Sequence, residues 1–277
     1  MSGNEQEADV KDFGDRAMLL RIIGAGIILL LLLWALLVPP ARAQTLGGSR
    51  ANAPLPAEPD LPAADLLIRF EGPALHFRWS LAPEAALEPE LVRALRSEAL
   101  AERTKAMREA EQAIANPPAG RGPIRTEWVE RWQAETETDS LLALSARTYS
   151  FTGGAHGSLG LRSILWDRAA ARRLEFAELF ADPELAYAAL QPGFCKALDA
   201  QRAVRRSGAR NPDFVDCPAL SSLPIVPVGD GKINSLRVLV PPYLAGPWSE
   251  GVYEIPLGPG PILPHLSPRY AGAFAKP

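Results

Sequence analysis

His156 is the residue of this 277-residue chain best placed for chemistry, because it stands in a glycine cluster at 153–157. The run HGSLG at 156–160 resembles the Gly-x-Ser-x-Gly elbow of serine hydrolases, with Ser158 in the nucleophile's place. Its first glycine is missing, however, and a strand-like run follows where the elbow needs a helix. We therefore predict a structural histidine that bonds main-chain groups across a tight turn, and whose loss would leave buried polar groups unpaired.

Metal and cofactor sites are not expected. The other two histidines, His76 and His265, form no three-ligand spacing with His156. No glycine run has the spacing of a dinucleotide fingerprint or a phosphate-binding loop. We predict no catalytic residue, no metal and no cofactor. An envelope hydrolase or deacetylase-type enzyme that uses His156 is the alternative.

Two aromatic side chains are candidates for a binding surface. Tyr243 and Trp248 stand among prolines and glycines in the run PPYLAGPW at 241–248. Exposed aromatic residues held by a stiff backbone are typical anchors of ligand-binding surfaces. Packing against the edge of a sheet explains the same pattern equally well. We predict Tyr243, Trp248 and His156 as ligand-binding residues.

The only two cysteines, Cys195 and Cys217, are predicted to form a disulfide. An even pair in an exported protein is more often bridged than free. A bridge that closes a loop of this size stabilises the fold by roughly 3 kcal/mol in the chain-entropy model.

Charge indicates no nucleic-acid partner, because the formal net charge is only −3. A local basic cluster is expected to be a solvated helix face; it consists of Arg202, Arg205, Arg206 and Arg210. Glu175 and Glu178 are expected to be surface charges rather than an acid–base pair.

The N-terminal part reads as an export segment. Residues 22–38 carry no charged side chain, and an Ala-Arg-Ala triplet ends at Ala43. A chain started at Met18 would be an ordinary signal peptide cleaved after Ala43. An uncleaved anchor in the inner membrane through residues 22–38 fits equally well. Both place the rest of the chain outside the cytoplasm, and residues 44–63 read as a flexible linker.

Hydrophobic periodicity predicts alternating strands and two helices. Strands are expected at 65–70, 75–79, 124–138, 141–151, 159–166, 223–228, 233–240 and 251–257. One helix is expected within 84–115. Its predicted inward face is Leu91, Leu95, Ala99, Ala106, Ala110 and Ala113. A second helix is expected from Pro183, with a possible break at Pro192. Its apolar residues are Leu185, Leu190, Phe194, Leu198 and Val204.

Three pieces of the chain, in this order, resemble one family. They are YSFTGGAHG at 149–157, then Asp167 with LEFAELF at 174–180, then VPPYLAGPWSEGVYEIP at 240–256. They are similar to the paired domains of unknown function in the extracytoplasmic half of the lysozyme-sensing anti-sigma factor RsiV, and to the domains that accompany the peptidoglycan deacetylase PdaC. The resemblance covers roughly residues 64–275. It implies an α+β fold with helices packed on antiparallel sheets, a cell-envelope location and protein recognition.

Two departures limit what the resemblance implies. Residues 170–172 lack the glycine usual in the family's turn, and the first 21 residues are too short for a sigma-binding domain. Anti-sigma activity is therefore not expected.

The predicted organisation has four parts. Residues 1–43 are a signal peptide or membrane anchor, 44–63 a flexible linker, and 64–152 and 153–277 two related α+β subdomains. The predicted function is that of an exported, non-enzymatic binding or sensing module of the cell envelope, periplasmic or membrane-anchored. Its expected partner is an envelope protein or a peptidoglycan-related ligand.

Overall fold

The structure, a computed structural model, describes residues 64–117 and 122–276. The predicted export segment, 1–43, and the predicted linker, 44–63, lie outside the described residues. Within the described ranges, no helix combines the length and the apolar composition needed to cross a membrane.

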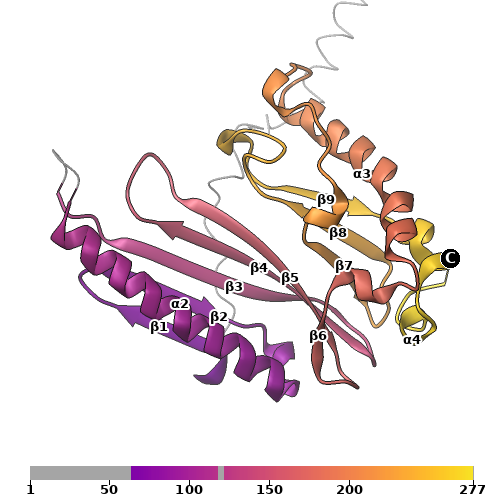
Figure 1. Cartoon of the computed structure of the whole chain (residues 1–277), viewed down its shortest axis with the longest axis horizontal. Helices are drawn as coiled ribbons and strands as arrows, with labels where there is room; N and C mark the ends of the chain where they lie inside the picture. Colours follow the sequence, from indigo (N-terminus) through magenta and orange to yellow (C-terminus); the bar gives the residue numbers. More distant parts are fainter. Residues whose placement is uncertain (1–63, 118–121, 277) are drawn as a thin grey trace, which may run out of the picture. The chain divides into compact units, whose positions relative to one another are not determined.

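Nine strands form one mixed sheet in the order β6-β5-β4-β3-β7-β8-β9 (Figure 1), and β1 and β2 join it at β3. The strands are β1 (Leu67–Glu71), β2 (Leu75–Ser80), β3 (Thr126–Glu137), β4 (Leu141–Phe151), β5 (Ser158–Asp167), β6 (Arg172–Leu174), β7 (Ile225–Asp230), β8 (Ser235–Val240) and β9 (Tyr253–Leu257). The predicted α+β class is confirmed. Most pairings are antiparallel, but β2 and β7 each run parallel to β3. An alternating sequence pattern indicates a strand's two faces and not the direction of its neighbour.

Three α-helices lie in the described part of the chain: α2 (Pro89–Ala115), α3 (Pro183–Arg205) and α4 (Pro268–Ala271). Short 3-10 helices occupy the connections: η2 (Ala64–Leu66), η3 (Pro83–Leu87), η4 (Phe176–Leu179), η5 (Pro212–Phe214), η6 (Leu220–Ser222), η7 (Trp248–Glu250) and η8 (Gly260–His265).

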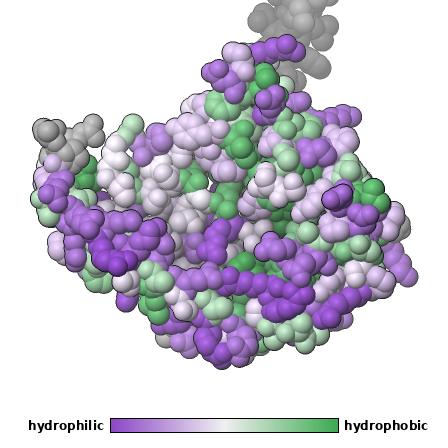
Figure 2. Space-filling view, viewed as in Figure 1, coloured by the Kyte–Doolittle hydropathy of each residue, from purple (hydrophilic) through white to green (hydrophobic). Residues whose placement is uncertain are grey.

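Helix α2 begins with Pro89 at its first position, where the missing N–H costs nothing. Its inward face is the one predicted, with the exception of Ala113; buried are Leu91, Leu95, Ala99, Ala106 and Ala110. Three of these are alanines, so the helix packs closely on the sheet. Hydrophilic side chains predominate over α2 on the outer face seen in Figure 2.

Helix α3 runs through Pro192 without a break, contrary to the possibility left open by the sequence. Two of the apolar residues predicted to belong to this helix are exposed: Leu185 is 54% exposed and Val204 is 80% exposed. The buried positions instead follow a spacing of four; they are Ala186, Leu190, Phe194, Leu198 and Arg202. An apolar side chain of a helix is buried only where the helical phase turns it toward the core.

Two hydrophobic cores share the central strands. The larger core is covered by α3 and contains Leu141 and Ala143 of β4. The smaller lies beneath α2 and contains Leu142 and Leu144 of the same strand. Because successive side chains of a strand point to opposite faces, β4 is buried on both sides over 141–146. The predicted boundary at 152/153 falls in the hairpin that joins β4 to β5; the division into two subdomains stays a prediction.

Candidate functional site

The three residues predicted to bind a ligand lie together. Tyr243 and His156 are 87 positions apart in the sequence, yet the Tyr243 hydroxyl is 2.9 Å from Nε2 of His156. The rings of His156 and Trp248 are stacked, with centroids 4.3 Å apart and an interplanar angle of 9°. Tyr243 and Trp248 have their ring centroids 6.3 Å apart. We call His156, Tyr243 and Trp248 the aromatic cluster.

His156 stands in the loop between β4 and β5, and both of its ring nitrogens are engaged. Nδ1 is 2.8 Å from the carbonyl oxygen of Gly157. A neutral ring with its proton on Nδ1 satisfies both bonds, because Nδ1 then donates to the carbonyl and Nε2 accepts from Tyr243. The predicted bond to a main-chain group is therefore present. The ring is exposed, whereas Gly157 is buried, and the expectation that loss of the ring would leave buried groups unpaired stays a prediction.

Gly157 allows this loop to fold back on β4. A Cβ atom at this position would clash with the ring of Tyr149 and would lie 2.7 Å from the carbonyl oxygen of Ser150. Such a distance to a backbone atom forces the strand to move. The glycine therefore sets the approach that brings His156 to the other two rings.

Tyr243 has an unusual backbone conformation, with φ at +70°. A bulky residue in this left-handed region is strained, and such residues concentrate at binding and catalytic sites. Its N–H donates to the carbonyl oxygen of Gly246 at 2.8 Å, which closes a tight turn. Tyr243 is 57% exposed and the following Leu244 is 43% exposed. The turn thus displays two large side chains to solvent.

Two arginines at the C-terminal end of α3, Arg202 and the C-cap residue Arg206, hold this turn. Arg202 is only 4% exposed. Its Nε donates to the carbonyl oxygen of Ala245 at 2.9 Å, and Arg206 Nη2 donates to the same oxygen at 3.1 Å. Arg206 also forms a bidentate ion pair with Glu250, in which Nε donates to Oε1 at 2.9 Å and Nη2 donates to Oε2 at 3.0 Å. The prediction that these arginines form a solvated helix face is therefore wrong for Arg202 and Arg206.

A signal for this role was present in the sequence. Arg202 lies four residues after Leu198 and eight after Phe194, on the buried stripe of α3. An arginine in register with an apolar stripe must find partners inside the protein, because burying an unpaired charge is costly. Those partners are backbone carbonyl groups, which sequence patterns do not identify.

We call Arg202 and Arg206, with their bonds to Ala245 and Glu250, the arginine clamp. Glu250 is its ionised acidic component. Burial acts to raise its pKa, but hydrogen bonds from Arg206 and Tyr253 and the positive charges nearby hold the pKa below its usual value. The same arrangement raises the pKa of Tyr253 to about 12, because its hydroxyl is buried and bonds the Glu250 carboxylate. A carboxylate stabilised in its charged form is a poor general acid.

Cys195 and Cys217 form the predicted disulfide. Gln191 of α3 lies beside both sulfur atoms, donates to the carbonyl oxygen of Pro218 at 2.9 Å and accepts from the N–H of Leu220. The bridge fastens the segment after α3 to that helix. Arg202 Nη2 donates to the carbonyl oxygen of Asp216, so the fastened segment also supports the clamp.

The remaining polar candidates have structural partners. Glu178 accepts from the N–H of Glu175 and pairs with Arg172 at 2.8 Å. Both glutamates are exposed, as predicted. The two ring nitrogens of His156 contact Gly157 and Tyr243, and among the described residues no hydrogen bond joins this ring to Ser158. Across residues 64–117 and 122–276, no group of three or more histidine, cysteine, aspartate or glutamate side chains is arranged to hold a metal ion.

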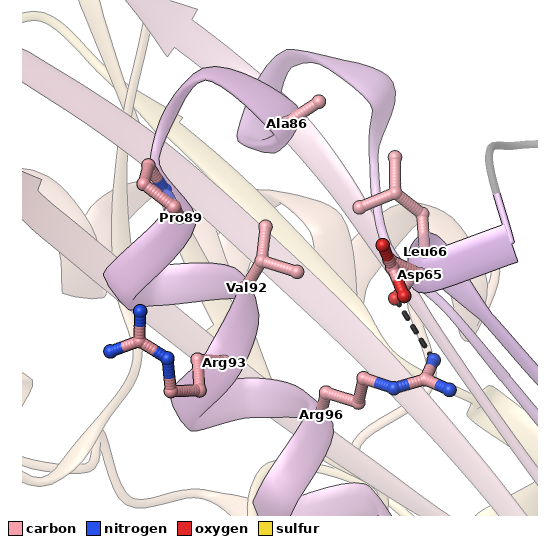
Figure 3. A pocket seen from close by; sticks show the side chains of 7 residues that line it. All are labelled: Asp65, Leu66, Ala86, Pro89, Val92, Arg93 and Arg96. Carbon is pink, nitrogen blue, oxygen red and sulfur yellow. Dashed lines mark hydrogen bonds between the residues drawn. The ribbon is translucent and has the colours of Figure 1, made fainter.

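A pocket of about 370 Å³ lies elsewhere, beside the first turns of α2 (Figure 3). It is lined by Asp65, Leu66, Ala86, Pro89, Val92, Arg93 and Arg96. Arg96 Nη1 donates to the carbonyl oxygen of Asp65 at 3.1 Å across it. The lining includes none of the aromatic cluster.

Comparison with known proteins gives likenesses of structure, among them two to proteins of one family. No protein-family model and no curated protein sequence matches the chain. The chain is similar to a DUF3298 family protein from Pseudomonas aeruginosa PAO1, at 18% identity and a TM-score of 0.45, over 75% of this chain and 91% of that one. It is also similar to a member of that family from Bacteroides fragilis NCTC 9343, at 15% identity and a TM-score of 0.42, over 67% and 73%. The DUF3298 proteins are domains of unknown function. The resemblance to the RsiV and PdaC-associated domains stays a prediction.

Proposed function

We propose that this chain is an exported, non-enzymatic binding module of the cell envelope, and that the aromatic cluster contacts its ligand, a protein or a cell-wall polymer. The observation that carries the proposal is the convergence of His156, Tyr243 and Trp248 from two distant segments at an exposed turn.

The support for binding is that the turn is fixed before a ligand arrives. The arginine clamp anchors Ala245 and Glu250, so the exposed side chain of Tyr243 projects from a stiff backbone. Ordering a mobile loop weakens association, and a preorganised loop avoids that loss. Aromatic side chains on such supports contribute large contact areas with few rotatable bonds.

The support against the enzyme alternative is the way His156 is used. A general base needs a nitrogen that reaches the proton it abstracts, and both nitrogens of His156 contact other groups of the protein. The disulfide supports an oxidising compartment. A reporter enzyme that works only outside the cytoplasm, fused after Pro277, is expected to be active; an inactive fusion at normal expression would contradict export.

The binding experiment uses the full-length chain and two probes, sedimented peptidoglycan sacculi and immobilised hen egg-white lysozyme. At least one probe is expected to bind. Tyr243→Ala and Trp248→Ala should each weaken that binding by about tenfold or more, as expected for anchors of an interface. Val204→Ala is the matched control, since Val204 is a large apolar residue exposed on α3.

Two outcomes would overturn the proposal. One is that neither probe binds, or that the two aromatic variants bind as well as Val204→Ala. The other is that the chain hydrolyses or deacetylates the sacculi and that His156→Ala abolishes this activity without changing the melting curve. That second outcome would establish the enzyme alternative.

A further inference from the structure

The outer edges of the sheet differ in whether a neighbouring element bonds to their backbone groups. At β1, Arg96 of α2 donates to the carbonyl oxygen of Asp65 (Figure 3) and also to that of Leu67. At β9, Gln201 of α3 donates to the carbonyl oxygen of Glu254 at 2.8 Å. At β5, the short strand β6 pairs only with 165–167, which leaves 158–164 without a neighbouring strand on that side (Figure 1).

The register identifies which backbone groups of β5 point outward. The N–H of Arg168 donates to the carbonyl oxygen of Ser140 at 3.0 Å, one step beyond the last paired residues of β4 and β5, Leu141 and Asp167. In an antiparallel pair, residues with bonds toward the partner alternate with residues whose groups point away. Every second residue back from Arg168 therefore faces β4. The outward residues of the uncovered stretch are Leu159, Leu161 and Ser163.

This assignment agrees with the position of β6. The same alternation makes Leu165 and Asp167 outward residues, and these two pair with Leu174 and Arg172 of β6. After Leu174 the chain leaves the sheet, because the capping box at Glu175 starts η4. The uncovered stretch thus begins where β6 stops and extends for about 23 Å, at about 3.3 Å per residue.

The outward groups of this stretch have no partner in the part of the chain that the structure describes. The N–H and C=O groups of Leu159, Leu161 and Ser163 make no hydrogen bond with a described residue. The usual protections of an edge are missing too, since 158–164 contains no proline and no bulge. Its one charged side chain, Arg162, is engaged on the α2 side by Glu98 at 2.9 Å.

We propose that this edge receives an extended segment of a partner polypeptide, which adds to the sheet as a strand antiparallel to β5 and in line with β6. The inference rests on the proposed function and deepens it by naming the ligand class. Its second support is position: the far end of the uncovered stretch, Ser158, is two residues from His156. The added strand therefore ends at the aromatic cluster, which supplies side-chain contacts where the backbone contacts stop.

Other occupants match the edge less well. Alternating N–H and C=O groups in a straight row are complementary to the backbone of another strand, and a glycan does not repeat that pattern. A second copy of the chain paired symmetrically about Leu161 would bring its own Gly157 opposite Leu165. That position is already held by Leu174 of β6.

Proline at Ser163 tests the edge directly. Because the Ser163 N–H points away from β4, Ser163→Pro removes an outward donor and leaves the bonds between β4 and β5 in place. Ser163→Ala is the matched control, since it removes the hydroxyl and keeps the N–H. Random linear dodecapeptides displayed on phage are selected on the purified full-length chain. The best binder is then synthesised and titrated against each variant.

The expected result is a selected peptide whose binding is weakened about tenfold by Ser163→Pro and little changed by Ser163→Ala. In the unmodified chain, the bound peptide should slow hydrogen exchange of the N–H groups of Leu159, Leu161 and Ser163. The N–H groups of Gly160 and Arg162 face β4 and should be protected already. This exchange pattern remains decisive if Ser163→Pro fails to fold.

Several outcomes would overturn the inference. These are a selection that yields no binder, or binders that depend on Trp248 but leave the three outward N–H groups unprotected; the second of these would keep the proposed function. Self-association of the chain that Ser163→Pro abolishes would assign the edge to a second copy. A peptide that protects the three N–H groups and binds the Trp248→Ala variant with unchanged affinity would support the strand addition. It would contradict the role of the aromatic cluster as a contact.

Discussion

Asp167 at the end of β5 allows a sharp test of how this strand is joined to the C-terminal helix α4. It is only 1% exposed. Its Oδ1 accepts from the N–H of Ala170 at 2.9 Å, and its Oδ2 accepts from Arg269 at 2.7 Å and from the hydroxyl of Tyr270 at 2.8 Å. Burial acts to raise its pKa, but these three donors and the charge of Arg269 hold the pKa below its usual value.

Asp167→Asn keeps the shape and removes the charge. If the amide oxygen stays with Arg269 and Tyr270, the amide nitrogen faces the N–H of Ala170, and that donor loses its partner. One unpaired buried donor costs about 1–3 kcal/mol, and the bonds that remain lose their charge assistance. Arg269 is 55% exposed on its side chain, so water screens its share. The expected loss of unfolding free energy is about 3 kcal/mol.

The pH dependence of stability provides a second test of the role of Asp167. Because the folded pKa of Asp167 is lowered, its contribution is fully present above the unfolded aspartate pKa, about 3.9, and is lost as pH falls through the folded value. The asparagine variant has no such dependence. The stability gap between the two proteins should therefore be widest near neutral pH and should narrow in acid.

Urea unfolding followed by circular dichroism at pH 7 and at pH 3 measures both quantities. Asp139→Asn is the control, since Asp139 is exposed in the turn between β3 and β4. A loss below about 1 kcal/mol at pH 7, or a gap that is equally wide at pH 3, would refute the account of Asp167, because a buried carboxylate with three donors has to show both effects.

Three further changes have defined outcomes. Replacing both Cys195 and Cys217 with serine should lower stability by roughly 3 kcal/mol, measured as a fall in melting temperature, and thiol labelling of denatured, unreduced protein should find no free cysteine; two labelled thiols would exclude the bridge. Gly157→Ala should cost about 1–3 kcal/mol in thermal melts, because the new methyl group meets backbone, and an unchanged melting temperature would show that the hairpin yields easily. Arg206→Met should cost roughly 3 kcal/mol by leaving Glu250 without its main partner, and should also weaken ligand binding; full binding by a destabilised variant would mean that the clamp does not position the turn.

The local sequence pattern was sufficient to predict those features that do not depend on which distant residue a side chain contacts. The inward face of α2 follows from residues spaced three, four or seven apart, and the disulfide follows from there being two cysteines. Strand positions were predictable for the same reason, since alternation reports burial. The composition of the run 241–248 also singled out the two aromatic residues that the structure places in one cluster.

The strand directions, the arginine clamp and the aromatic cluster could not be predicted, because each depends on residues far away in the sequence. The parallel neighbours of β3 come from β2 and β7, and nothing in β3 itself specifies their direction. The clamp joins Arg202 to a carbonyl group 43 residues away, and every residue type has such a carbonyl. The meeting of His156 with Tyr243 is likewise a result of tertiary folding, because it joins a hairpin loop to a turn 87 residues later.

The double burial of β4 determines how the described part of the chain unfolds. Residues such as Leu142 and Leu144 stabilise the layer under α2, while Leu141 and Ala143, on the same backbone, stabilise the layer under α3. Neither layer can lose this strand without exposing apolar surface of the other. Unfolding should therefore be a single cooperative transition, with coincident loss of signals from both layers. A chain cut at 152/153 would leave β4 without β5, and neither fragment should fold alone.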